Sequence, residues 1–553
     1  MKRFCYLFSA MLTFAGTGEA LAQQPSVTAV LQRNNIKAVV QSNGALFQDF
    51  SQGQFIVPYA PGQPEITALR GAGLWLGGLD AGGNLKVAAQ LYNQNGMADF
   101  QTGLHPENAT GFSPLNKIWR VTREQIEAHR ADFADNGVVD NPISAIFGWP
   151  GKDNLFFSDY NQGMTLPFTP SNLAPYWDND GTGTYDPHRG DFPVLGIRGC
   201  LENAPIADEM LWFAFHDAIA HTQTGGQRMN VEVQATVFTY GCQEADNPLN
   251  DVVFVNYKII SLGVEQIFDT YFGIFTDIEI GNFNDDFAGC DPDRQLIFGY
   301  NSDPDDEGFY GANPPVVAID FLRGPLSEGA QEVPVRALFP IGNNGIDPGT
   351  PVEYYRLLSG QQVDGTAVAN GGFPYPDDPN DPSGDSEVTA DNTPGNRRML
   401  STFGPFRLDP GAVNELIVAF SFTQQPGATP LENVAAMYDR VDVLQNHFDG
   451  CFSNLGNSCS PLVSSDEETI GARVEMKVMP NPASNEVRVL FSGQEVRRLE
   501  VYDATGKKVS ELFRETGASE WRLPVGQLPS GIYWVKAQGE DGSFTAKPLV
   551  VSR

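Results

Sequence analysis

The chain has 553 residues, with 35 Lys and Arg against 68 Asp and Glu, which gives a formal net charge of −33 at pH 7. A surface this acidic repels phosphate backbones and anionic lipid, so the composition argues against nucleic-acid binding. It would instead concentrate cations, although acidic surface residues also serve simply to keep a protein soluble. The length exceeds that of one ordinary domain and predicts more than one large core.

The N-terminus has the pattern of a secretory signal. Lys2 and Arg3 precede an apolar run at residues 4–15, and Ala20-Leu21-Ala22 supplies a small-x-small cleavage pattern before Gln23. The apolar run is shorter than the roughly 20 residues that cross a bilayer, and no later segment is apolar enough. We therefore predict a signal peptide at residues 1–22, export of the protein, and no transmembrane segment.

The body that follows is predicted to be mainly β, with few helices. Thr122 and Gln125 form a plausible capping box for a helix to about residue 133, and apolar spacing predicts a longer helix over 431–448. We predict a multi-domain, β-sandwich-like body, with an N-terminal β-rich domain at 23–245 and a second at 246–452 that ends in the helix. Short β-branched or aromatic runs separated by turn residues lie at 38–41, 72–76, 85–90, 231–240, 252–260, 270–275, 316–320 and 415–422.

After a linker at 453–473, residues 474–553 have the alternation of a small antiparallel sandwich. Val487, Val489 and Phe491 alternate with polar residues, and turn sequences separate the strands. Four motifs occur there in order: Pro480-Asn481-Pro482, the turn from Asp503 to Gly506, the turn from Pro529 to Gly531 followed by Tyr533, and a basic last residue.

These four motifs closely resemble the type A C-terminal sorting domain of the type IX secretion system in Bacteroidetes-like bacteria. The resemblance implies an immunoglobulin-like sandwich, export across the outer membrane, and release or attachment at the cell surface. It also implies the secretion machinery as a partner. Pro548 departs from the usual final strand and puts edge pairing there in doubt.

The mature chain would contain Cys200, Cys242, Cys290, Cys451 and Cys459. Export favours pairing of cysteines, because the compartments outside the cytosol are oxidising. The short spacing predicts a disulfide between Cys451 and Cys459, and a weaker pairing of Cys200 with Cys242 would leave Cys290 over.

An acidic loop at 176–187, with the sequence YWDNDGTGTYDP, is the strongest candidate for a metal site. Calcium prefers six to eight hard oxygen ligands, and the spacing of the loop's oxygens, with Gly183 at the sixth position, resembles calcium loops of the EF-hand type. Arg189 stands where such a loop has its bidentate Glu, and Asp191 could substitute for it. The alternative is a surface turn rich in Asp and Asn. The predicted ligands are Asp178, Asp180, Thr182, Thr184 through its carbonyl, Asp186 and Asp191.

A second acidic cluster follows the predicted strand at 270–275. Carboxylates that leave a strand end repel one another unless a cation or strong donors neutralise them, so calcium is again expected. The rival interpretation is a pair of acid and base carboxylates of a glycosidase. The residues of this cluster are Asp277, Glu279, Asp285, Asp286 and Asp291.

Two functions remain open from the sequence. The favoured hypothesis is a calcium-stabilised, β-rich, adhesin-like or structural binding component, whose ligand would be a surface polysaccharide or matrix. The alternative is a glycan-directed extracellular hydrolase. The chain has no GxSxG, P-loop, HExxH or GxGxxG after a strand, so it is more plausibly not an enzyme. Segments 74–92, 177–193, 275–291 and 403–411 resemble large secreted Bacteroidetes proteins with the same sorting domain. That resemblance supports the two acidic loops as a shared design and implies no catalytic activity.

Overall fold

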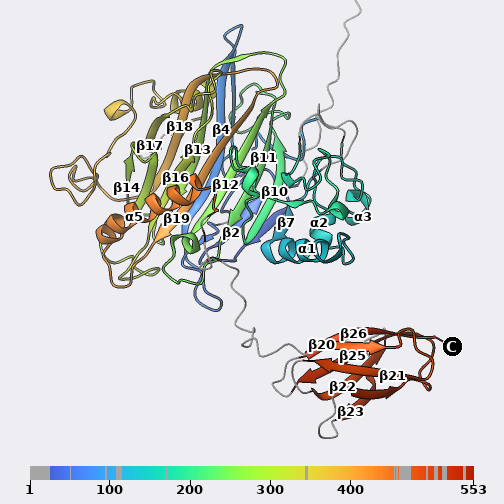
Figure 1. Cartoon of the computed structure of the whole chain (residues 1–553). Coiled ribbons are helices and arrows are strands. Elements are labelled where there is room, and N and C mark those ends of the chain that lie inside the picture. The colour runs from blue at the N-terminus through green and yellow to red at the C-terminus, as the bar shows by residue number, and fades with distance from the viewer. Residues whose placement is uncertain are drawn as a thin grey trace, which may run out of the picture. The chain divides into compact units, whose positions relative to one another are not determined.

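The computed structural model describes residues 25–49, 52–93, 96–106, 115–167, 172–342, 347–453, 455, 459, 475–492, 496–503, 508–513, 520–539 and 544–552. The chain forms two compact units, of which the first ends at Pro461 and the second begins at Leu462. The predicted signal peptide, most of the predicted linker and Gly506 lie outside the described residues. Both units consist mainly of antiparallel strands, as the sequence predicts (Figure 1).

The first unit contains two large antiparallel sheets. The first sheet has the order β1-β2-β3-β4-β13-β18-β17, and β5 also pairs with β4. Its strands are β1 (Thr28–Leu31), β2 (Lys37–Gln41), β3 (Phe55–Ile56), β4 (Thr67–Asp80), β5 (Leu85–Ala89), β13 (Ile267–Ile278), β17 (Val335–Ile341) and β18 (Arg397–Leu408).

The second sheet has the order β14-β15-β16-β19-β12-β11-β10-β6, and β7 also pairs with β10. Its strands are β6 (Gln101–Thr102), β7 (Trp119–Thr122), β10 (Glu209–His216), β11 (Val231–Thr239), β12 (Val252–Ser261), β14 (Asp286–Asp291), β15 (Leu296–Asn301), β16 (Val316–Arg323) and β19 (Val413–Thr423). Every strand-like run predicted from the sequence falls within or overlaps one of the strands of these two sheets.

The two sheets pack face to face around one continuous core. Phe272 and Ile274 of β13 belong to the same buried cluster as Leu211 of β10 and Val253 of β12. Both sheets take strands from before and after residue 245, and the whole segment to Pro461 is one compact unit. The predicted division of the body near residue 245 is therefore wrong, because β12 pairs with β11 on one side and β19 on the other.

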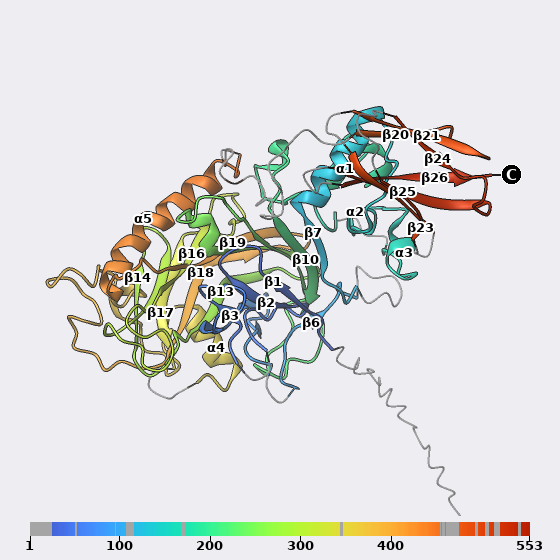
Figure 2. The same ribbon diagram turned by 90° about the horizontal axis from the view of Figure 1, so that it is seen from below.

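Helices cover parts of the outer faces of the two sheets (Figures 1 and 2). The helix α4 (Pro351–Leu358) packs Tyr354 and Leu357 against Trp75 of the first sheet. The long helix α5 (Pro430–Asp449) packs against β15 and β16 of the second sheet. The helices α1 (Arg123–Asn136), α2 (Ser144–Phe147) and α3 (Phe157–Tyr160) lie beside β7 and β10.

Both predicted helices are confirmed, and the capping boxes define their starts. The side chain of Thr122 accepts from the backbone of Gln125, and the side chain of Gln125 accepts from the backbone of Thr122. Thr429 and Glu432 make the same exchange at the start of α5. Each box satisfies amide groups that a helix N-terminus leaves without an intrahelical partner.

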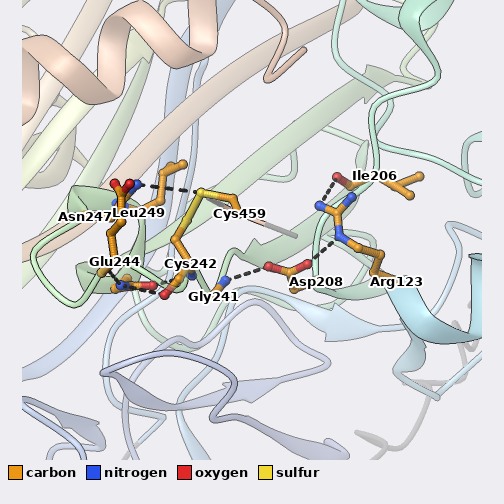
Figure 3. The surroundings of a disulfide bond; sticks show 10 residues. Arg123, Ile206, Asp208, Gly241, Cys242, Glu244, Asn247, Leu249 and Cys459 are labelled. Carbon is orange, nitrogen blue, oxygen red and sulfur yellow. Dashed lines mark hydrogen bonds and ion pairs between the residues drawn. A yellow bond between two sulfur atoms is a disulfide. The ribbon is translucent and has the colours of Figure 1, made fainter. Parts of the chain in front are cut away.

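The disulfides differ from the prediction. Cys200 is bonded to Cys451, across a sequence separation of 251 residues. Cys242 is bonded to Cys459, across a separation of 217 residues (Figure 3). Among the described residues Cys290 is a free, buried thiol, as expected. The prediction failed because α5 returns the chain to the second sheet, so that cysteines far apart in sequence meet there. Together the two bonds fix the end of the first unit to its body.

The second unit contains two small antiparallel sheets, with orders β20-β21-β24 and β23-β22-β25-β26. Their strands are β20 (Glu475–Met479), β21 (Glu486–Ser492), β22 (Val496–Asp503), β23 (Lys508–Phe513), β24 (Glu520–Pro524), β25 (Gly531–Gly539) and β26 (Phe544–Val551). Two predicted motif residues act as connectors: Asn481 accepts from the backbone of Val550, and the Tyr533 hydroxyl donates to the Pro529 carbonyl. β26 pairs through Pro548, which an edge strand tolerates.

We predict that replacing both Cys242 and Cys459 by Ser lowers the free energy of unfolding by about 2–5 kcal/mol, because cross-links over long loops restrict the unfolded chain. Urea unfolding of the double variant measures the loss, and Cys290→Ala serves as the control for a cysteine outside any disulfide. A peptide map without reductant that joins Cys451 to Cys459 would contradict the connectivity.

Candidate functional site

The acidic loop predicted from the sequence is closed by a short ladder of two strands. β8 (Tyr176–Trp177) pairs with β9 (Phe192–Pro193), so that Trp177 lies opposite Phe192. Because Asp178 directly follows β8 and Asp191 directly precedes β9, this pairing brings the two carboxylates to the same end of the ladder. The helical turn η2 (Pro187–Arg189) completes the loop between them.

Three carboxylates of this loop converge. One oxygen each of Asp178, Asp180 and Asp191 can be chosen so that all three lie within 4.8 Å of one another. Asp191 is fully buried, and this burial, together with the charges of Asp178 and Asp180, raises its pKa to about 6. The backbone carbonyl of Asp191 accepts a hydrogen bond from Nε2 of His129 at 2.9 Å. His129 is a buried residue of α1, so this bond ties the loop to the helix.

Backbone amides surround the converging carboxylates. Asp178 accepts from the amides of Gly181, Thr182 and Gly183 at 2.7 to 3.1 Å. Gly181 and Gly183 have φ of 72° and 74°, a conformation that non-glycine residues rarely adopt and that lets the chain bend around the carboxylate. Asp191 accepts from two further amides, each at 2.8 Å. Backbone amides therefore hold two of the three converging carboxylates in place.

The remaining predicted ligands of the loop have other contacts. The Thr182 hydroxyl donates to the carbonyl of Thr184 at 3.3 Å. Asp186 caps η2 by accepting from the backbone of His188, and it pairs with Arg189 at 3.4 Å. Arg189 also donates to Asp180 at 3.0 Å, so part of the loop's charge is balanced by an exposed guanidinium.

A pocket of roughly 600 Å³ lies beside the acidic loop. Asp178, Gly183 and the half-buried ring of Tyr176 contribute one wall. The floor is formed by side chains of β10, β11, β12 and β19 on the outer face of the second sheet. The loop and the sheet are thus two sides of the same cavity.

The floor of the pocket contains an aligned row of polar side chains. Gln234 of β11 is in register with Lys258 of β12, which is in register with Glu415 of β19. Thr236 and Asn256 form the next row on the same face. Further along these strands the same face carries residues such as Phe238 and Phe254, which belong to a buried apolar cluster. On this side the polar rows therefore border a region of the face that is covered by apolar packing.

The sequence prediction did not find these floor residues. The available signal was polar residues at alternate positions of an apolar strand, as with Asn256 and Lys258 in the sequence VVFVNYKII. The pairing of Gln234, Lys258 and Glu415 depends on the strand register, which no local pattern contains.

The second acidic cluster predicted from the sequence is dispersed. Asp277 accepts from the Tyr92 hydroxyl, and burial, the largest cause, raises its pKa to about 7. Burial raises the pKa of Glu279, and the nearby charge of Arg70 partly opposes this shift. Asp291 pairs with Arg294 at 2.7 Å, at the far end of β14 from Asp286.

Asp285 and Asp286 instead lie near Asp306, in the turn that follows β15. All three carboxylates bind the segment 280–282: Asp286 accepts from the amide of Ile280, Asp306 from the amide of Asn282, and Asp285 from the side chain of Asn282. Asp286 and Asp306 are fully buried, and burial raises the pKa of both. A Cβ at Gly281 would lie 2.0 Å from Oδ2 of Asp306, so only glycine permits this approach.

Comparison with known proteins identifies the C-terminal unit. Residues 477–552 match the family model described as "Secretion system C-terminal sorting domain". The predicted type IX sorting domain is thereby confirmed, and with it secretion of the protein to the cell surface or outside the cell. No helix in the described part of the chain is both long and apolar enough to cross a membrane.

The other comparisons add little. The comparison with curated proteins gives no match. Among solved structures, a polysaccharide lyase matches with 8% sequence identity and a TM-score of 0.16, over 58% of this chain and 34% of the lyase chain. The chain thus spans about a third of the length of that lyase, and a likeness at this TM-score carries no argument.

The raised pKa of Asp277 predicts a pH-dependent stability. A carboxyl with a pKa near 7 in the folded state and 3.8 as its ordinary value stabilises the fold fully below about pH 4 and loses that contribution as the pH rises through 7. We expect the wild type to lose stability relative to the Asp277→Asn variant between pH 5.5 and pH 8, so the difference between their free energies of unfolding should fall over this range. Urea unfolding at several pH values measures it, and a constant difference would contradict the assignment.

Proposed function

We propose that this secreted protein is an adhesin-like binding component of the cell surface or its surroundings, in which Ca²⁺ holds the acidic loop as one wall of the pocket. The observation that carries the proposal is the convergence of Asp178, Asp180 and Asp191 within 4.8 Å, on a loop whose Asp178 and Gly183 also line the pocket. Sorting to the outside of the cell supports a role in contact with the environment.

The ligand set favours calcium over a transition metal. The converging groups offer only oxygen atoms, which hard cations prefer, while zinc and copper sites use imidazole or thiolate. Two ligands of one calcium ion are at most about 5 Å apart, because each lies 2.3–2.6 Å from the ion. The oxygens of the three carboxylates already meet this limit.

Electrostatics gives the ion its structural effect. Three carboxylates held this close repel one another, and the fully buried Asp191 has also lost the hydration that stabilises its charge. A divalent cation converts this repulsion into attraction. An exported protein needs only modest affinity for this purpose, since extracellular calcium modules bind with dissociation constants of about 10⁻⁴–10⁻³ M.

The alternative, a glycan-directed hydrolase that uses the second cluster as an acid–base pair, gains no support from the geometry. Asp277 is 4% exposed and Asp286 is 0% exposed, so neither carboxyl group presents itself to a glycan at the surface. Asp277 is also held by Tyr92, whereas Asp286 binds the backbone of Ile280.

Calcium is predicted to raise the melting temperature of the mature chain above its value in EDTA. Binding to the folded state alone at 100 times the dissociation constant contributes about 2.7 kcal/mol. Asp180→Asn and Asp178→Asn, which keep the side-chain shape, should lose most of the increment. Asp305→Asn, an exposed change in another acidic turn, should retain it. Equal melting of the wild type in calcium and in EDTA would overturn the proposal.

A further inference from the structure

The floor of the pocket contains acceptors that the described part of the chain does not satisfy. Gln234 is 2% exposed and Asn256 is 5% exposed, yet Oε1 of Gln234 and Oδ1 of Asn256 have no hydrogen-bond partner among the described residues. Both side chains line the pocket. A buried acceptor without a partner is costly, so a ligand that brings hydroxyl donors to these two oxygens would recover that cost.

Three basic side chains line the same pocket, in a protein whose net charge is strongly negative. Lys258 lies in the floor, and Lys152 and Arg198 are half-buried around it. Lys258 is half-buried, and this burial lowers the pKa of its ammonium group, while the nearby charges of Glu232 and Glu415 oppose the shift. An anionic group of a ligand would compensate that loss of hydration.

The acidic residues of the pocket have partners of their own. Glu415 pairs with Arg323 at 3.4 Å and accepts from the side chain of Asn256 at 3.2 Å. Asp178 belongs to the loop for which calcium is proposed above. Three basic side chains against two acidic ones leave the lining with an excess of positive charge, although Glu415 lies beside Lys258.

Apolar surfaces complete the cavity. The ring of Tyr176 is half-buried in the wall, and Trp212 lies in the floor next to Thr236. Leu201 and Val413 are 49% and 53% exposed at the cavity. Rings and aliphatic side chains of this kind pack against the apolar face of a ligand ring. The volume of roughly 600 Å³ suits a ligand of a few sugar units.

We propose that this pocket binds an acidic saccharide, a sugar chain that carries carboxylate or sulfate groups. Its hydroxyls donate to Gln234 and Asn256, its anionic group accepts from Lys258 and Arg198, and a ring face packs on Tyr176. The proposal rests on the proposed function, because the acidic loop is one wall of the pocket, and it names the ligand class of that site.

Titration calorimetry on the full mature chain in CaCl₂ tests this assignment. The probes are trigalacturonate, a chondroitin sulfate tetrasaccharide, neutral cellotriose and a tetraglutamate peptide. We expect at least one acidic saccharide to bind about tenfold or more tightly than cellotriose and the peptide, with an affinity that falls as salt is added. The carboxylated and sulfated probes distinguish the two sources of charge. Failure of both acidic saccharides to bind, or stronger binding of the peptide, would overturn it.

Variants then locate the binding. Lys258→Met keeps the aliphatic stem and removes the charge, so affinity for the preferred acidic saccharide should fall about tenfold to hundredfold. Arg198→Met removes the positive charge of a second, half-buried pocket residue, and it provides the test if Lys258→Met does not fold. Lys37→Met, which breaks an ion pair with Glu65 away from the pocket, is the control and should bind as the wild type does. Unchanged affinity in the pocket variants would place the ligand elsewhere and overturn the proposal.

Repeating the titrations in EDTA separates this inference from the calcium proposal. Binding in EDTA that still depends on Lys258 supports the pocket and counts against a need for the ion. A calcium-dependent melting temperature without binding of either acidic saccharide supports the ion and overturns the pocket assignment.

Discussion

The packing of the two large sheets against each other constrains everything else in the first unit. Their inner faces form one core, so each sheet has only its outer face left to cover or to use. On the second sheet, α5 covers the β15–β16 region, and a buried cluster that includes Trp119 and Phe254 covers the region near β10. Between them, the polar rows of β11, β12 and β19 remain under a cavity. The pocket thus lies over a part of the outer face of the second sheet that neither α5 nor the buried cluster covers.

Negative charge is arranged around this scaffold in two different ways. At the acidic loop, Asp178, Asp180 and Asp191 converge, backbone amides donate to Asp178 and Asp191, and calcium is the cation that we propose for the site. At the segment 280–282, Asp285, Asp286 and Asp306 each accept from backbone or side-chain amide groups, and burial raises the pKa of Asp286 and Asp306. The proposed binding function depends on the first arrangement alone.

Local patterns in the sequence predicted local structure correctly. The capping box of Thr122 and Gln125, the apolar spacing of α5, and the closeness of Asp178 to Asp191 within one loop all depend on residues near one another in the chain. The sorting domain was likewise found from motifs within one short segment, and the match to residues 477–552 confirms it.

Features that depend on strand register or on the return of the chain could not be predicted. The pairing of Cys242 with Cys459 requires α5 to bring the chain back to the second sheet. Asp306 joins Asp285 and Asp286 because of the turn that follows β15, whereas the length of β14 separates Asp291 from them. The row of Gln234, Lys258 and Glu415 exists only because three strands distant in sequence pair in one register.

The most direct test of the calcium-held wall is a crystal of the mature chain grown in CaCl₂ and measured at a long wavelength, where calcium scatters anomalously. The account predicts an anomalous peak between the carboxylates of Asp178, Asp180 and Asp191, at 2.3–2.6 Å from an oxygen of each. The account is contradicted if the map shows the loop intact but without such a peak, so that Arg189 is the only positive charge beside its carboxylates.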